Sequence, residues 1–314
     1  MRLIAPNYYT SFSCIGSHCK HNCCIGWEID VDDFSLSYYK SLNGALGKKL
    51  KENIYVDACG AHFALDGNDR CPFLTDDGLC EIINEIGEDA LCDICAKHPR
   101  FRNSYSDHIE VGIGLACEEA ARIILTNKNP VEFITLDNVY KNNKPNQKEN
   151  EFLSERENLF SQIQNNERTF LQKISFLYER YKLKPFEHIS EFARCYLNFE
   201  HLTKEWPELL ENLASRSIKA DKLFENTSYD KPFENLLHYF LFRHLNPSLT
   251  YVEMCATVGA AILSVFIIAS VFVQKGDPSI ESLIDISRLY SSEIEYSDVN
   301  MELLVDIVEE FNYV

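Results

Sequence analysis

Ten of the twelve cysteines lie before residue 118, and their spacing is typical of metal ligands. Four stand within CIGSHCKHNCC at residues 14–24, two are separated as C-x8-C at 71 and 80, two as C-x2-C at 92 and 95, and one follows at 117. Zinc takes four tetrahedral ligands from such pairs, but adjacent Cys23 and Cys24 cannot easily both face one small ion. An iron–sulfur cluster accepts thiolates from separate loops. The spacing therefore favours a [4Fe-4S] cluster, with zinc as the alternative.

The remaining cysteines are expected to be buried or incidental thiols, because they stand outside the paired spacings. These are Cys59, Cys195 and Cys255. Cys92 is intermediate, since it has a C-x2-C partner but also fits a core position. A chain of 314 residues can bury a core without disulfides, and no secretory leader is recognised at its start. A cytoplasmic location and metal chemistry are therefore expected rather than disulfides.

Two parts are expected to position these residues in a mainly α fold. Residues 1–139 should form a cysteine-rich, loop-rich metal-binding part with short strands, 140–150 a linker or long loop, and 151–314 an all-α helical bundle. Two apolar faces recur at helical spacing in the second part. They are Phe170, Ile174, Leu177, Tyr178 and Tyr181, and Phe233, Leu236, Leu237, Phe240 and Leu241.

Three local patterns predict single elements. An Asp cap precedes the expected helix DDFSLSYYKSLN, and HIEVGIGLAC at 108–117 reads as a strand leading into a helix, CEEAARIILT. The closing SSEIEYSDVNMELLVDIVEEF begins with a Ser and Glu capping pattern and predicts an acidic amphipathic helix. Gly112 and Gly114 lack the third glycine of a dinucleotide fingerprint.

Charge and hydropathy limit the partners. The net charge of -18 argues against nucleic-acid binding and favours basic partners. Residues 254–273 carry no charge and are long enough to span a bilayer, but no Lys/Arg cluster flanks them. We expect a helix buried in the middle of the bundle, and membrane association is not expected.

The cysteine motifs resemble those of the FliB-type flagellin lysine-N-methylases and, in shorter form, the wider YkgJ-like cysteine cluster family. The resemblance covers about the first 120 residues: the Cys23-Cys24 doublet followed by Gly26-Trp27, then CPFLTDDGLC (71–80), CAKHPRFR (95–102) and GLAC, which ends at Cys117. The helical remainder is similar in general character and in the stretch E-I-E-Y-S-x-x-N. Eight cysteines match the pattern: Cys14, Cys19, Cys23, Cys24, Cys71, Cys80, Cys95 and Cys117.

The resemblance implies a cytoplasmic enzyme that binds S-adenosylmethionine and an iron–sulfur cluster and methylates lysines of flagellin or another lysine-bearing protein. Methylation requires the neutral amine, whereas a free lysine has a pKa near 10.4. The site must therefore desolvate the lysine or accept its proton. No radical is needed for a nucleophilic nitrogen, so turnover without a reductant is expected. The residue that accepts the proton and the methyl-donor pocket are not identified by the sequence.

Two other functions fit the residues alone. A zinc- or cluster-binding adaptor needs no donor pocket and would not bind S-adenosylmethionine. An iron–sulfur redox protein would show a reversible potential and no methyl transfer. Eight thiols also exceed the four of one cubane, so the sequence leaves open a second metal site or structural thiols.

Overall fold

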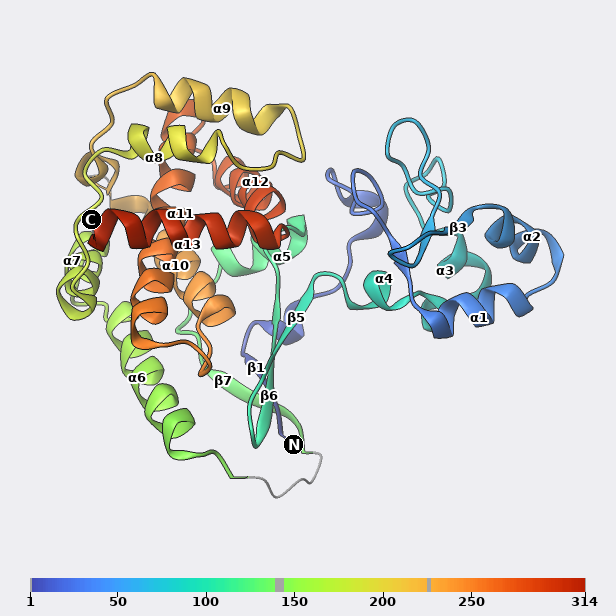
Figure 1. Cartoon of the computed structure of the whole chain (residues 1–314), viewed down its shortest axis with the longest axis horizontal. Coiled ribbons are helices and arrows are strands. Elements are labelled where there is room, and N and C mark those ends of the chain that lie inside the picture. Colours follow the sequence, from blue (N-terminus) through green and yellow to red (C-terminus); the bar gives the residue numbers. More distant parts are fainter. Residues whose placement is uncertain (1, 139–143, 225–226, 314) are drawn as a thin grey trace. The chain divides into compact units, whose positions relative to one another are not determined.

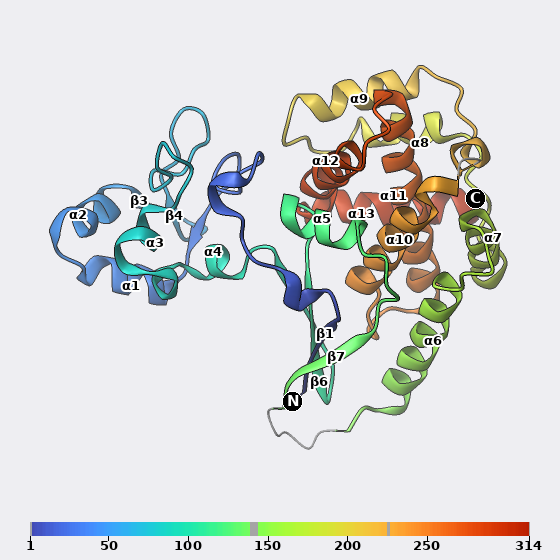
Figure 2. The same ribbon diagram turned by 180° about the vertical axis from the view of Figure 1, so that it is seen from behind.

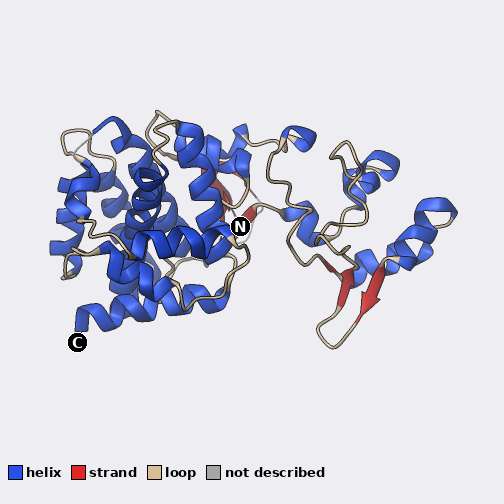
Figure 3. Cartoon of the chain, turned by 90° about the horizontal axis from the view of Figure 1, so that it is seen from above, coloured by secondary structure: helices blue, strands red, loops and turns tan. Residues whose placement is uncertain are grey.

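The computed structural model describes residues 2–138, 144–224 and 227–313 (Figure 1). The chain divides into two compact units. The first comprises Met1–Phe12, Phe101–Ala116 and Ala120–Val314, and the second comprises Ser13–Arg100 with Cys117–Glu119. Helix dominates the described residues and strands are few (Figure 3), so the prediction of a mainly α fold is confirmed.

The second unit is small and rich in loops. A three-stranded antiparallel sheet has the order β2 (Asp30–Val31), β4 (Ala61–Phe63), β3 (Ile54–Val56). Four short helices surround it: α1 (Asp33–Ser41), α2 (Gly44–Glu52), α3 (Glu81–Ile86) and α4 (Asp93–Lys97). The predicted Asp cap is present, since the Asp32 side chain accepts the Ser35 N–H at 2.9 Å. A small apolar core forms around Tyr39, Leu50 and Phe73.

The first unit begins with a mixed four-stranded sheet in the order β5 (Arg100–Ser104), β6 (His108–Ile113), β1 (Arg2–Pro6), β7 (Phe133–Asn138). Strand β1 pairs parallel to β6 and antiparallel to β7. The predicted strand from residue 108 is therefore confirmed, and the helix expected after it is α5 (Glu118–Leu125). At Gly112 an added Cβ would lie 2.2 Å from Phe101 Cζ, so only glycine lets β6 pack this closely.

Helices complete the first unit, and both predicted apolar faces are confirmed. The α-helices of this part are α6 (Gln147–Ile163), α7 (Phe170–Tyr181), α8 (Ile189–Tyr196), α9 (Glu205–Ala214), α10 (Asp230–His244), α11 (Tyr251–Lys275), α12 (Ile280–Tyr290) and α13 (Asp298–Tyr313). Helix α11 is central and packs against α10, α12 and α13, as two opposite views show (Figures 1 and 2). A capping box between Thr250 and Glu253 fixes its start.

Helix α11 contains the uncharged stretch that the sequence singled out. Among the described residues it is the one helix long and apolar enough to cross a membrane, and 94% of its apolar window is buried inside the structure. A helix apolar on all sides is expected at the centre of a bundle, where every face meets protein. The prediction of a buried central helix is confirmed.

Three predicted segments differ in detail from the structure. Residues Ser291–Glu295 form a short π-helix continuing α12, and α13 begins only at Asp298, so the closing segment is not a single helix. The predicted linker 140–150 falls partly outside the described residues, and its last residues, 147–150, already belong to α6. The compact units also run differently from the predicted ranges 1–139 and 151–314, because β1, β6 and β7 belong with the helices of the first unit.

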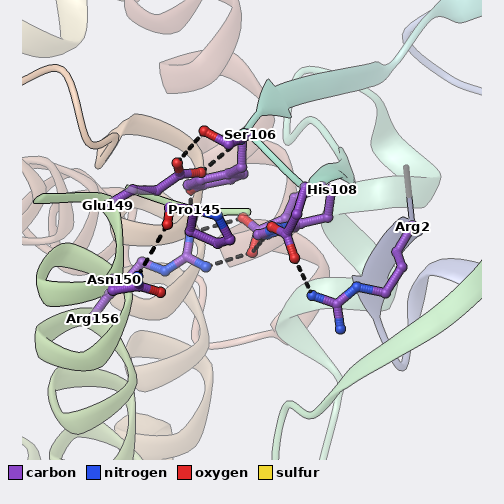
Figure 4. Close-up of polar contacts among 10 residues, drawn as sticks. Arg2, Ser106, His108, Pro145, Glu149, Asn150 and Arg156 are labelled. Carbon is purple, nitrogen blue, oxygen red and sulfur yellow. Dashed lines mark hydrogen bonds and ion pairs between the residues drawn. The ribbon is translucent and has the colours of Figure 1, made fainter. Parts of the chain in front are cut away.

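A buried ion pair fastens β6 to α6 (Figure 4). The Arg156 guanidinium donates two hydrogen bonds to Glu110, at 2.8 and 2.5 Å, and a third to the Tyr105 hydroxyl at 2.6 Å. His108 lies between Asp107 and Glu110, at 2.7 and 3.5 Å. Burial lowers the pKa of His108, but the hydrogen bonds that its ring donates to these two carboxylates outweigh burial and raise the pKa above its ordinary value.

Candidate functional site

Six thiols of the second unit gather beside its apolar core. Cys71 and Cys92 belong to that core, and Cys24, Cys80 and Cys95 pack against it partly buried. Cys23 completes the group through a thiol hydrogen bond to Cys24. We call Cys23, Cys24, Cys71, Cys80, Cys92 and Cys95 the six-thiol group.

Backbone geometry brings these cysteines together from four segments. The Cys71 N–H donates to the Cys24 carbonyl at 2.8 Å. Cys80 directly precedes α3, and the N–H groups of the first turn of α3 favour its thiolate, but burial outweighs them and raises the pKa of Cys80. Cys92 directly precedes α4, and the Cys95 thiol one turn later lowers the pKa of Cys92. The thiolate is the form that binds metal; burial disfavours it in Cys80, whereas the neighbouring Cys95 thiol favours it in Cys92.

The electrostatics of the six-thiol group favour a bound cation. The Cys24 thiol is close enough to Cys71 and Cys80 for their negative charge to raise its pKa. Cys24 and Cys71 have the same effect on the pKa of Cys95. Burial raises the pKa of Cys71 to about 11, and the neighbouring Cys80 thiol adds to this effect. Several thiolates at this spacing repel one another, so a cation is needed to keep them ionised together. The donors are all sulfur, as soft metals and iron–sulfur clusters prefer.

A smaller group involves two other predicted ligands. Cys19 lies within electrostatic range of Cys117, and the Cys19 sulfur is 3.6 Å from Glu118 Oε2. That carboxylate also accepts the Lys20 N–H at 2.8 Å. Cys14 is exposed, and its sulfur accepts the Gly16 N–H at 3.4 Å.

Five of the eight predicted ligands therefore lie in the six-thiol group. Cys19 and Cys117 lie beside Glu118, and Cys14 lies near Gly16. Within the described ranges, no three His, Cys, Asp or Glu side chains stand close enough to enclose an ion as they are placed. The eight ligands therefore remain a prediction. Two cysteines outside the motif pattern differ: Cys59 is exposed, whereas Cys92 is buried within the group. The buried His62, which is 4% exposed, has its Nδ1 atom 2.8 Å from Asp30 Oδ1.

The first unit contains a second candidate site, a cavity of about 680 Å³ among α10, α11, α12, the π-helix and α13. Apolar residues of α10, α11 and α13 form much of its wall, and five carboxylates line it. These are Glu253, Glu295, Glu302, Asp306 and Glu309. Among the described residues that line this cavity, none is Lys or Arg. Such a cavity suits a small cationic group.

A histidine–carboxylate pair lies at the wall of this cavity. His244 Nε2 is 2.7 Å from Glu295 Oε1, and the Tyr239 hydroxyl donates to Glu295 Oε2 at 3.1 Å. Arg243 Nε is 3.4 Å from the same carboxylate. Burial raises the pKa of Glu295, but Arg243 and the His244 hydrogen bond outweigh it and hold the pKa below its usual range. Glu295 is therefore an anion that orients His244.

Tyr239 connects the pair to the strand–helix turn of the GLAC motif. Its hydroxyl accepts the Leu115 N–H at 3.1 Å and the Arg243 Nη1 at 2.7 Å while donating to Glu295. All three hydrogen bonds are buried or partly buried. The position of Glu295 is therefore fixed by the local fold before any substrate arrives.

The sequence did not identify His244 or Glu295 as site residues. His244 closes α10, where a histidine is common because the helix dipole favours positive charge. Glu295 belongs to the E-I-E-Y-S-x-x-N stretch, which was noted for its resemblance alone. The available signal was the unusual placement of two glutamates inside a buried apolar segment, since unpaired charges are rarely buried.

These observations define a mainly α protein with a thiol-rich unit and with an acidic cavity in its helical unit. The family model of the FliB lysine N-methylase C-terminal domain matches residues 110–314, and the chain belongs to this family. The resemblance noted from the cysteine motifs is thereby confirmed. The family model matches mainly the helical part, where the sequence showed only a general likeness.

Three related proteins come from Salmonella. The flagellar biosynthetic protein FliU of Salmonella muenchen is 30% identical over 130 residues, covering 39% of this chain and 76% of FliU. Lysine-N-methylases of Salmonella typhimurium and Salmonella choleraesuis are each 29% identical over 130 residues, 39% of this chain. The match spans 32% of the length of either lysine-N-methylase. No solved structure matches the chain.

Proposed function

We propose that the protein is a lysine N-methyltransferase that uses S-adenosylmethionine to methylate lysines of flagellin or of another lysine-bearing protein. The observation that carries this proposal is membership of the FliB lysine N-methylase family over residues 110–314. The names of the relatives support a flagellar role and lysine as the acceptor. The acidic cavity is consistent with a cationic substrate.

The proposal includes an iron–sulfur cluster held by the six-thiol group. All-sulfur donors on separate loops fit a cluster better than a single small ion. Within the group, Cys92 joins five predicted ligands: Cys23, Cys24, Cys71, Cys80 and Cys95. A bound cluster would neutralise the thiolates and tie together loops that share only a small core. The remaining predicted ligands, Cys14, Cys19 and Cys117, would serve a second site or structure.

The test is methylation by protein purified without oxygen. Iron, sulfide and zinc are measured first, because about four irons and four sulfides per chain indicate a cubane. The protein is then incubated with S-adenosylmethionine and purified flagellin, and lysine methylation is read by peptide mass spectrometry, with and without a reductant. Donor-dependent methylation supports the proposal. Stoichiometric zinc with no binding of S-adenosylmethionine would instead identify an adaptor.

A further inference from the structure

The cavity of the helical unit provides what a lysine methylase requires, and this inference rests on the proposed function. We propose that the cavity accepts the ε-ammonium group of the substrate lysine. His244, positioned by Glu295, then takes the proton that must leave before the amine is methylated.

The lining of the cavity favours a lysine over the methyl donor. A lysine side chain presents one positive charge on an apolar stem, and the cavity pairs apolar walls with carboxylates. S-adenosylmethionine also carries a carboxylate, which would require a basic partner, and no described residue of the lining is Lys or Arg. Arg243 lies behind Glu295 and balances its charge, so the attraction comes from Glu253, Glu302, Asp306 and Glu309.

The hydrogen bond to Glu295 determines which nitrogen of His244 can accept a proton. Because Glu295 is ionised, Nε2 carries the hydrogen and donates it at 2.7 Å. Nδ1 of the neutral ring then holds the lone pair. Since His244 lines the cavity and is the last residue of α10, the positive charge it gains faces both Glu295 and the carbonyl end of the helix.

The chemistry balances without a further reagent. The lysine ammonium transfers one proton to His244 Nδ1 and becomes a neutral amine. Its nitrogen lone pair attacks the methyl carbon of the sulfonium donor, so that the N–C bond forms while the C–S bond breaks and its electron pair stays on sulfur. The products are a methylammonium and a neutral thioether, and His244 returns its proton to solvent. His244 thus makes the reactive amine, while Glu295 is a positioning residue.

The experiment compares four variants of the full chain with the wild type in methyl transfer to flagellin across pH. His244→Ala should lower kcat/KM by about 100-fold, and added imidazole should restore part of the rate. Glu295→Gln should make the fall of kcat/KM at acidic pH less pronounced than in the wild type. The double variant Glu302→Gln/Asp306→Asn should raise KM several-fold at unchanged kcat. Glu310→Gln on the same helix, whose residue does not line the cavity, should match wild type.

A binding measurement separates this inference from the proposed function. Nα-acetyl-lysine methylamide and its uncharged norleucine counterpart are compared by saturation-transfer NMR with wild type and with Glu302→Gln/Asp306→Asn. Binding of the lysine probe alone, lost in the double variant, supports the cavity even if flagellin is not methylated. Wild-type methylation with an unaffected or imidazole-insensitive His244→Ala variant would overturn the inference and leave the proposed function standing. Equal binding of both probes would also overturn it.

Discussion

The buried pair of Glu110 and Arg156 allows a quantitative test of what holds β6 to α6. Their side chains are 3% and 6% exposed, and they share two hydrogen bonds. Replacing Arg156 by Met removes the guanidinium from the buried Glu110 carboxylate and leaves that carboxylate beside His108 at 3.5 Å, which costs about 3–5 kcal/mol of unfolding free energy. The variant also removes the hydrogen bond to Tyr105. We expect its melting temperature to fall by about 10 °C, at about 2–4 °C per kcal/mol for a unit of this size.

A double-mutant cycle makes this prediction specific. Glu110→Gln alone should also destabilise, but Glu110→Gln/Arg156→Met should lose clearly less than the sum of the single variants, because neither charge remains unpaired. We expect a coupling of about 2–3 kcal/mol by urea unfolding. The more exposed pair of Glu155 and Arg180 on α6 and α7 serves as the control, and its cycle should give less than about 1 kcal/mol. Additive losses at the buried pair would refute the reasoning.

Three further predictions concern single positions. Because the pKa of His108 is raised in the folded state, its contribution should be fully present at acidic pH and lost as pH rises through that pKa, so melting at pH 5.5 and 8.5 should differ less in His108→Gln than in wild type. Gly112→Ala should lower the free energy of unfolding by about 1–3 kcal/mol, because the new methyl group overlaps the Phe101 ring. Denaturant titration measures this loss, and an unchanged free energy of unfolding would mean that the ring moves aside freely. Cys92→Ala should reduce the iron bound per chain, whereas Cys59→Ala, at an exposed position, should keep it; equal iron in both would remove Cys92 from the ligand set.

Local periodicity predicted the elements whose buried face follows from the pattern of their own residues. The faces led by Phe170 and Phe233 became the buried sides of α7 and α10, because a period of 3.6 identifies a helix face directly. The uncharged stretch of α11 was correctly expected at the bundle centre. The strand beginning at His108 was also recognisable from β-branched residues in alternation.

Pairing between distant segments could not be predicted in the same way. The parallel register of Leu3 with Ile109 joins residues far apart in the chain, and nothing in either segment alone specifies its partner. The cavity has the same origin, since His244 and Glu295 come from different helices and meet only when α10 packs beside the end of α12. Cys92 was left undecided because a buried ligand and a core thiol look alike in sequence.

Two glutamates of the π-helix at Ser291–Glu295 have different roles. Glu293 and Glu295 stand two positions apart, so they face nearly opposite sides of a helix. Glu293 accepts the backbone N–H groups of Leu202 and Thr203 at 2.7 and 2.8 Å, which anchors the segment that leads into α9.

Asn300 completes that anchor from the start of α13. It accepts the Glu200 N–H at 2.9 Å and donates to the Glu293 carbonyl at 2.7 Å. Two acidic or amide positions of the motif therefore satisfy backbone groups, and Glu295 alone lines the cavity. Loss of Glu293 or Asn300 should consequently appear first as lost stability, whereas loss of Glu295 should appear first in the pH dependence of the reaction. The stretch from Glu293 to Asn300 thus supports the site on one side and forms part of it on the other.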